Sequence, residues 1–300
     1  MQRLLREKSC MGALEVRSGH CRMISQCLPD NERKEKMTDW PSVNQELESL
    51  LRLRTFPVAL KLLKSAGDLG SIKHKKPANP TTFCQLITQS RTFGWTVGFT
   101  ARDLVPSCGL VAGLRKGVDE DFLLSVGDVW FKDRNEALSK YAPENWPRIP
   151  GDFEAAVLSP LGGGKIEPDM IIIFGNPAQM IRVINGLQWE HYEKFEFSSC
   201  GESACSDSIG RCYETGKPAM TIPCFGERRY GHVQDDELIM AIPPGYIDTL
   251  ILGMKQLDKM GLRYPIAFYG AQTDLLPGFP PSYQKAIKKD QEEWGSHENG

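Results

Sequence analysis

Residues 169–174 have the sequence DMIIIF and residues 56–63 have the sequence FPVALKLL, two apolar runs of strand length that decide the fold. An apolar run without polar alternation is typical of a strand buried on both faces, as in a parallel or mixed sheet. Further strand-like segments occupy residues 95–101, 122–131, 153–159, 194–199, 219–223 and 237–243. Helical patterns alternate with them over about 42–53, 82–92, 109–115, 134–141, 177–187, 202–213 and 246–260. We therefore predict a mixed α/β (α+β) protein with a mixed sheet.

The chain also shows a weak internal similarity. A shift of 116 residues superposes Cys84 on Cys200 and Cys108 on Cys224. One interpretation is an ancient duplication, with similar halves at residues 37–150 and 151–300 joined at a proline-rich linker. Coincidence is the other interpretation, because overall identity between the halves is low.

The first 36 residues differ from the rest in composition, with eight Lys/Arg against five Asp/Glu and no sustained periodicity. A helical pattern begins only after Met37. We interpret residues 1–36 as a disordered basic arm or as an extension upstream of the true start at Met37. The cysteines of this segment, Cys10, Cys21 and Cys27, are therefore left out of the site prediction.

Composition excludes several functional classes. The 300 residues are 41% hydrophobic and 25% charged, as in an ordinary globular protein, with a net charge of −2. That charge gives no general attraction to nucleic acid or anionic lipid, and no apolar run approaches the ~20 residues of a membrane span. The N-terminus lacks the apolar region of a secretory signal, so we expect a cytoplasmic protein with reduced cysteines. Clustered cysteines in such a compartment are metal ligands or redox groups more often than disulfides.

Six cysteines follow Met37: Cys84, Cys108, Cys200, Cys205, Cys212 and Cys224. Four thiolates are sufficient to hold a tetrahedral zinc ion or an iron–sulfur cluster. The closely spaced pairs of zinc sites are absent, and the C-x4-C-x6-C-x11-C run from Cys200 to Cys224 fits neither ferredoxin spacing. The fold would therefore have to assemble the site from distant segments, and a cluster is favoured over zinc.

Local sequence around two of these cysteines supports a bound group. Cys108 and Cys224 each follow a strand-like run, and Gly109 and Gly226 lie beside them. Glycine at the end of a strand allows a cofactor to approach the backbone amides closely, so both glycines are candidate cofactor-binding residues. A helix beginning near CGESACSD would favour thiolate over thiol.

A histidine and two arginines follow the last cysteine. Arg228 and Arg229 are able to clamp a carboxylate or phosphate beside the cysteine site, and His232 is a candidate acid or base. The alternative is that the arginines form surface salt bridges with Asp235 or Asp236.

Several blocks together resemble a known family. They are LRTFPVALKLL, PTTFCQLITQSRTFGWTV, DLVPSCGLVAGL and SACSDSIGRCYETGKPAMTIPCFGERRYGHVQDDELIMAIPP. As a set they are similar to the domain-of-unknown-function 169 family of bacteria and archaea, common in anaerobes. The resemblance implies a cytoplasmic location and suits oxygen-sensitive chemistry, but the family carries no assigned activity. The cysteines that match its pattern are Cys84, Cys108, Cys205 and Cys224, whereas the internal similarity selects Cys200, so both choices stay open.

We therefore expect a cysteine-ligated metal or iron–sulfur protein of anaerobic redox metabolism, with a 4Fe–4S cluster as the candidate cofactor. Its partners would be a small anionic substrate or a redox partner protein. One alternative is a metal-free binding or accessory protein whose cysteines only pack. Another is a thiol-dependent enzyme in which His232 serves as the base for one reactive cysteine.

Overall fold

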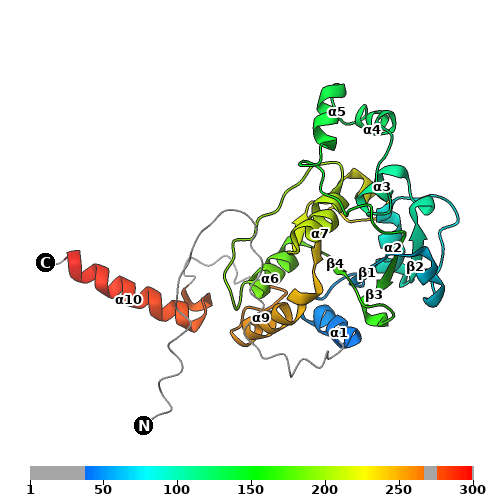
Figure 1. Cartoon of the computed structure of the whole chain (residues 1–300). Coiled ribbons are helices and arrows are strands. Elements are labelled where there is room, and N and C mark those ends of the chain that lie inside the picture. Colours follow the sequence, from blue (N-terminus) through cyan, green and yellow to red (C-terminus); the bar gives the residue numbers. More distant parts are fainter. Residues whose placement is uncertain (1–37, 267–275, 299–300) are drawn as a thin grey trace, which may run out of the picture. The chain divides into compact units, whose positions relative to one another are not determined.

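The computed structural model describes residues 38–266 and 276–298 (Figure 1). Its strands are β1 (Val58–Leu63), β2 (Val97–Thr100), β3 (Ala155–Pro160), β4 (Met170–Gly175), β5 (Ala219–Thr221) and β6 (Leu238–Ile242). They form one sheet in the order β2-β3-β1-β4-β6-β5, and every neighbouring pair is antiparallel. The α+β class is thus confirmed, whereas the prediction of a mixed sheet was wrong.

The helices are distributed along the described chain, and several follow one another without a strand between them. They are α1 (Trp40–Leu51), α2 (Phe83–Phe93), α3 (Pro106–Val111), α4 (Glu120–Gly127), α5 (Arg134–Tyr141), α6 (Pro177–Leu187), α7 (Arg211–Thr215), α8 (Phe225–Arg229), α9 (Ile247–Lys259) and α10 (Pro281–Glu298). A π-helical turn, Ser206–Gly210, leads directly into α7. Short 3₁₀ turns lie at Ala66–Ser71, Ala101–Asp103, Leu161–Gly163, Pro244–Tyr246 and Leu276–Gly278.

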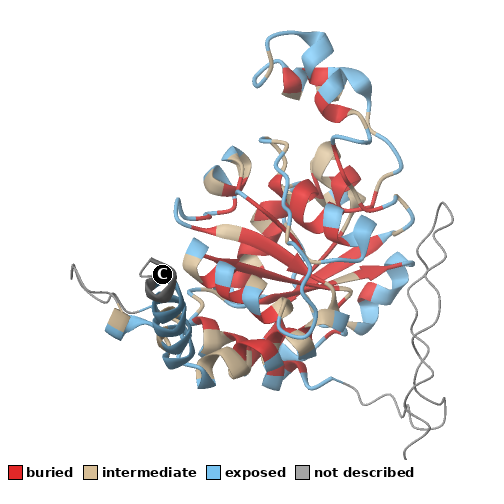
Figure 2. Ribbon diagram, turned by 90° about the vertical axis from the view of Figure 1, so that its left-hand side faces the viewer, coloured by how far each residue is buried: buried red, intermediate tan, exposed pale blue. Residues whose placement is uncertain are grey.

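Both faces of the sheet are covered, which explains the unbroken apolar runs. On one face Ile171 and Ile173 of β4 pack in a cluster with residues of α1, α6 and α9. On the other face Ile172 and Phe174 pack with residues of α2 and of the helical segment that contains Ile209. Figure 2 shows the resulting buried sheet between partly exposed helices. Because side chains alternate across a strand, burial on both faces needs apolar residues at every position whatever the strand direction.

Two predicted strands are absent. Residues 122–131 fall largely in α4, whose first turn is capped by the Asp119 carboxylate accepting a hydrogen bond from the Asp121 amide. Residues 194–199 form no strand, although the Ser198 carbonyl accepts a bond from the Thr221 hydroxyl of β5 at 2.8 Å. Residues 122–131 are largely apolar and residues 194–199 alternate between polar and apolar side chains. Short runs of either kind also occur outside strands.

The predicted duplication has no support in the described residues. The segment that includes α4 would have to correspond to β6, so a helix would replace a strand. The proposed halves also interleave, because β1 from residues 37–150 lies between β3 and β4 from residues 151–300. The extension 1–36, with its three cysteines, lies outside the described residues. Among the residues described, no helix has the length and apolar character needed to cross a membrane.

Candidate functional site: four cysteines at the starts of helices

Four cysteines come together on one face of the sheet, each at the start of a helical segment. Cys84 is the second residue of α2, Cys108 the third of α3, Cys205 directly precedes the π-helical turn, and Cys224 caps α8. Cys108, Cys205 and Cys224 all pack against the apolar cluster on the α2 side of the sheet. We call these four residues the cysteine cluster.

Local sequence fixes these helix starts. Thr82 and Gln85 form a capping box at the start of α2, and the Thr82 hydroxyl lies 3.0 Å from the Cys84 sulfur. Pro106 occupies the first position of α3, where its missing amide proton is not needed. The Cys84 thiol also donates to the Gly226 carbonyl at 3.5 Å, which ties α2 to α8.

The four thiols interact electrostatically with one another. Burial raises the pKa of Cys205 well above its usual value, and the charges of Cys108, Glu227, Cys224 and Cys84 raise it further. Burial likewise raises the pKa of Cys108 to about 12, with contributions from Glu202, Glu227 and Cys224. For Cys84 and Cys224 the pKa is also raised, first by burial and next by Glu227. Without a bound cation these thiols are therefore protonated at neutral pH, and the thiolate preference predicted from a helix start is outweighed by burial.

Hydrogen bonds from backbone groups lower the pKa of Cys224 and so oppose the effect of burial. Burial and Glu227 raise the pKa of this thiol, whereas hydrogen bonding from the backbone of Ala204, Glu227 and Gly226 lowers it. These groups belong to the starts of two different helical segments, so the backbone around Cys224 is arranged to receive negative charge on sulfur.

The two remaining described cysteines lie apart from the cluster. The Cys200 amide donates to Asp207 at 2.7 Å, and burial, followed by Asp207, raises the Cys200 pKa to about 12. Cys212 is enclosed in the apolar core, and burial alone raises its pKa to about 12. The structure thus brings Cys205, rather than Cys200, to Cys84, Cys108 and Cys224.

Glu227 is a further residue beside the cysteine cluster, and no motif of the sequence indicates it. Its side chain is 2% exposed, and both carboxylate oxygens lack a hydrogen-bond partner in the described protein. Burial raises its pKa to about 7, although the charge of Arg91 acts to lower it. The available signal was its spacing, because a residue three positions after Cys224 lies on the same side of α8.

The other predicted site residues lie beside the cluster rather than in it. Gly226 contributes the carbonyl that binds the Cys84 thiol, and its own added Cβ would lie 3.7 Å from the Cys224 sulfur. Gly109 lies inside α3, where an added Cβ would meet the Arg115 side chain at 3.1 Å. Cys108 is also within a helix, so the predicted strand-to-turn setting holds for Cys224 but not for Cys108.

Arg228 and Arg229 form the end of α8, and His232 lies in the loop that follows it. Arg228 donates to the Gln234 carbonyl at 2.8 Å and pairs with Asp235 at 3.2 Å. It therefore forms the surface salt bridge that was the alternative to binding a carboxylate or phosphate. Arg229 and His232 are exposed. His232 has a φ of 53°, and its carbonyl accepts from Arg91, so its backbone has a structural part in this loop.

The cysteine cluster does not have the geometry of a mononuclear metal site. Within the described ranges, no three His, Cys, Asp or Glu side chains are arranged to hold a metal ion. Tetrahedral zinc would place its four thiolate sulfurs roughly 3.8 Å apart, given a zinc–sulfur distance of about 2.3 Å. A polynuclear cluster holds its thiolates farther apart, because metal and sulfide atoms lie between them.

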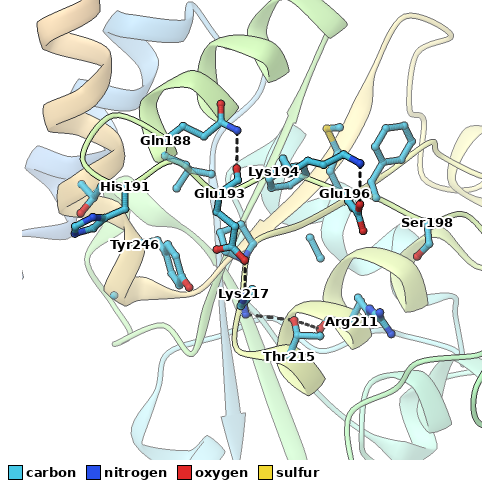
Figure 3. Close-up of a pocket in the computed structure, with 18 of the residues that line it drawn as sticks. Gln188, His191, Glu193, Lys194, Glu196, Ser198, Arg211, Thr215, Lys217 and Tyr246 are labelled. Carbon is cyan, nitrogen blue, oxygen red and sulfur yellow. Dashed lines mark hydrogen bonds and ion pairs between the residues drawn. The ribbon is translucent and has the colours of Figure 1, made fainter. Parts of the chain in front are cut away.

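A separate cavity of about 710 Å³ lies at the edge of the sheet, beside β5 and α7 (Figure 3). Its charged side chains pair with one another or with close neighbours: Lys217 with Glu193 at 2.5 Å, Lys194 with Glu196 at 3.1 Å, and Arg211 with Glu214 at 3.4 Å. No cysteine lines it. The cavity is lined by side chains of both charges, with Glu190 and Asp207 beside the paired residues.

The raised pKa of Glu227 predicts how the stability of the metal-free protein depends on pH. The folded protein keeps this proton up to about pH 7, whereas the unfolded chain releases it near the ordinary glutamate pKa of 4.5. Between these values the folded state binds more protons, so the free energy of unfolding falls as pH rises, by at most about 3 kcal/mol. Urea unfolding at pH 5 and pH 8 in the presence of chelator should show that Glu227→Gln loses less stability than the wild type. Equal losses in the two proteins would contradict the assignment.

The fold and the site together define a class: an antiparallel α+β protein with four thiols and one carboxylate between helix starts on one face of its sheet. The profile of the DUF169 family, described as uncharacterised ArCR, matches residues 46–252, and the chain belongs to this family. The whole cysteine cluster and Glu227 lie within the matched region. The chain is also 27% identical over 221 residues to the uncharacterized protein MJ0308 of Methanocaldococcus jannaschii, covering 72% of this chain and 94% of that protein. No solved structure matches the chain.

Proposed function

We propose that the cysteine cluster binds a metal group through thiolates and that this group is an iron–sulfur cluster of the 4Fe–4S type. The observation that carries the proposal is the convergence of four thiols from four separate helix starts: the Cys84 thiol donates to the Gly226 carbonyl beside Cys224, and Cys84, Cys108 and Cys224 all act on the pKa of Cys205. A multi-iron group is favoured over zinc because the sequence lacks the closely spaced cysteine pairs of zinc sites.

The surroundings of the thiols suit an anionic group. Helix starts present unpaired amide groups and the positive end of the helix dipole, which stabilise negative charge. Backbone groups of Ala204, Glu227 and Gly226 already favour thiolate at Cys224. Because the pKa of every thiol in the cluster is raised, metal binding must displace protons, and affinity should increase with pH.

A redox role in the cytoplasm follows as part of the same proposal. Such a cluster accepts one electron from a reduced carrier and passes one electron to an oxidised carrier or substrate. Phe225, the neighbour of Cys224, is 55% exposed, and its ring lies 5.6 Å from that of the exposed Trp130. The chain beside Cys224 therefore reaches the surface, where a redox partner protein or a small anionic substrate is able to approach.

Anaerobic purification of the full chain, followed by reconstitution with iron and sulfide, tests the proposal. We expect a brown protein with iron and sulfide bound in near-equal amounts and a broad visible absorbance that bleaches on reduction. A colourless protein without bound metal would contradict it and support the metal-free alternative. A single reactive thiol in a metal-free protein would support the thiol-enzyme alternative, which the raised pKa values disfavour.

A further inference from the structure

The cavity beside β5 and α7, about 710 Å³ in volume, has the size of a small-molecule binding site (Figure 3). Ligand pockets in proteins usually measure about 300–1,000 Å³ and combine an apolar lining with a few polar groups. The apolar part of the lining here consists of Leu187, Phe195, Phe197, Ala219, Met220 and Tyr246. The cavity therefore offers a ligand both apolar surface and charged groups, and the charges decide which ligand it accepts.

The lysine and arginine side chains of the lining are each paired with a carboxylate. The pairs are Lys194–Glu196, Lys217–Glu193 and Arg211–Glu214. Two carboxylates of the lining, Glu190 and Asp207, form no ion pair with a basic side chain in the part of the chain that the structure describes. Glu190 accepts a hydrogen bond from the Thr249 hydroxyl at 3.0 Å, which is a neutral donor. The cavity thus presents an excess of negative charge to a ligand.

Asp207 is the buried member of this pair of carboxylates. Its residue is 4% exposed, and its carboxylate accepts from the Cys200 amide at 2.7 Å and from the Ser198 hydroxyl at 3.5 Å. Because Ser198 also lines the cavity, the carboxylate lies at the cavity wall. A buried carboxylate is costly unless an opposite charge compensates it, and both of these donors are neutral. A cationic group of a ligand would supply the compensating charge.

The backbone at Asp207 has an uncommon conformation. Ser206–Gly210 is a π-helical turn, a form that is rare in proteins and frequent at functional sites. The residues on either side of Asp207 are fully buried, and their hydroxyls donate to carbonyl groups: Ser206 to Pro147 and Ser208 to Ala204. These bonds fix the turn, so the Asp207 carboxylate is held at the cavity before a ligand arrives.

We infer that the cavity binds a small organic cation, with a protonated amine against the Asp207 carboxylate and an apolar body against Phe195, Met220 and Tyr246. The ammonium group donates a charge-assisted hydrogen bond to Asp207, which is stronger than a bond between neutral groups. Glu190, which is exposed, adds negative charge to the same lining. The inference goes beyond the proposed function and does not depend on it, because the cysteine cluster does not line the cavity.

Three ligands with the same phenol ring test the preference for a cation. Tyramine carries an ammonium group, tyrosol a hydroxyl group and 4-hydroxyphenylacetate a carboxylate. In calorimetric titrations of the full chain at pH 7, tyramine should bind about 10- to 100-fold more tightly than tyrosol, because a hydrogen bond between charged groups is replaced by a weaker one. The carboxylate should bind most weakly. Equal binding of tyramine and tyrosol, a preference for the carboxylate, or no binding of tyramine would overturn the inference.

Asp207→Asn tests the assigned anchor, because the amide keeps the shape of the side chain and an acceptor for the Cys200 amide. Its affinity for tyramine should fall to about that for tyrosol, while its affinity for tyrosol stays that of the wild type. Asp248→Asn is the matched control, since Asp248 is exposed and adjoins Thr249 without lining the cavity. It should bind tyramine as the wild type does. Unchanged tyramine binding by Asp207→Asn, or an equal loss of both ligands, would show that Asp207 does not select the cation. Iron content, measured separately, decides the proposed function.

Discussion

Cys108→Ser is expected to abolish stable metal binding, whereas Cys200→Ser leaves it intact. Cys108 belongs to the cysteine cluster, where Glu227 and Cys224 influence its thiol, while Cys200 is bound to Asp207 and Ser203 in a neighbouring loop. Loss of a direct ligand should weaken binding by more than the roughly 10- to 100-fold that follows from loss of a supporting residue. Iron and sulfide content after anaerobic reconstitution measures the difference.

The two variants make the same chemical change at cysteines of similar burial. Each removes one partly buried thiol and replaces it with a hydroxyl, so any general effect of thiol loss appears in both. Equal metal content in the two variants would contradict the assignment of the cluster. Loss of metal in Cys200→Ser alone would instead favour the ligand choice that the internal similarity suggested.

Arg91→Met is expected to destabilise the protein by about 3–5 kcal/mol, the usual cost of removing one partner from a buried ion pair. Arg91 is 2% exposed, and it binds the buried Glu237. Its guanidinium also lies 4.0 Å from the centre of the Phe174 ring, on the face of the sheet that carries the cysteine cluster. The substitution would leave Glu237 and Glu227 buried without a compensating charge. Urea unfolding of the metal-free protein at neutral pH measures the loss.

Removal of both partners provides the comparison. Arg91→Met combined with Glu237→Met should recover most of the lost stability, because the pair is replaced by apolar side chains of similar volume. Arg54→Met is the surface control, since Arg54 and Asp236 are 53% and 51% exposed and their pair should contribute little. A small loss for Arg91→Met, or a double variant less stable than the single one, would show that Glu237 does not depend on Arg91.

The sequence located most of the strands but not their directions. The apolar runs at 56–63 and 169–174 identified β1 and β4, because burial on both faces leaves a clear pattern. That pattern is the same for parallel and antiparallel strands when helices cover both faces, so the prediction of a mixed sheet failed. The run at 122–131 failed because a short apolar segment also suits a helix packed on one side.

The candidate site was predictable only in part. Composition and family resemblance selected the cysteines, but their convergence depends on how the starts of α2, α3 and α8 meet in space. Cys200 and Cys205 are both near the start of one helical segment, and only the fold separates them. Glu227 was missed because an acid beside two arginines suggests a solvated helix, and only its burial shows otherwise.

An anomalous-scattering map at the iron edge, from crystals of the anaerobically reconstituted full chain, provides the most direct test of the site. We expect density for a group of irons among Cys84, Cys108, Cys205 and Cys224, with a different iron within bonding distance of each of the four sulfurs. A map without iron density among these four sulfurs, or with iron bound at Cys200, would contradict the assignment.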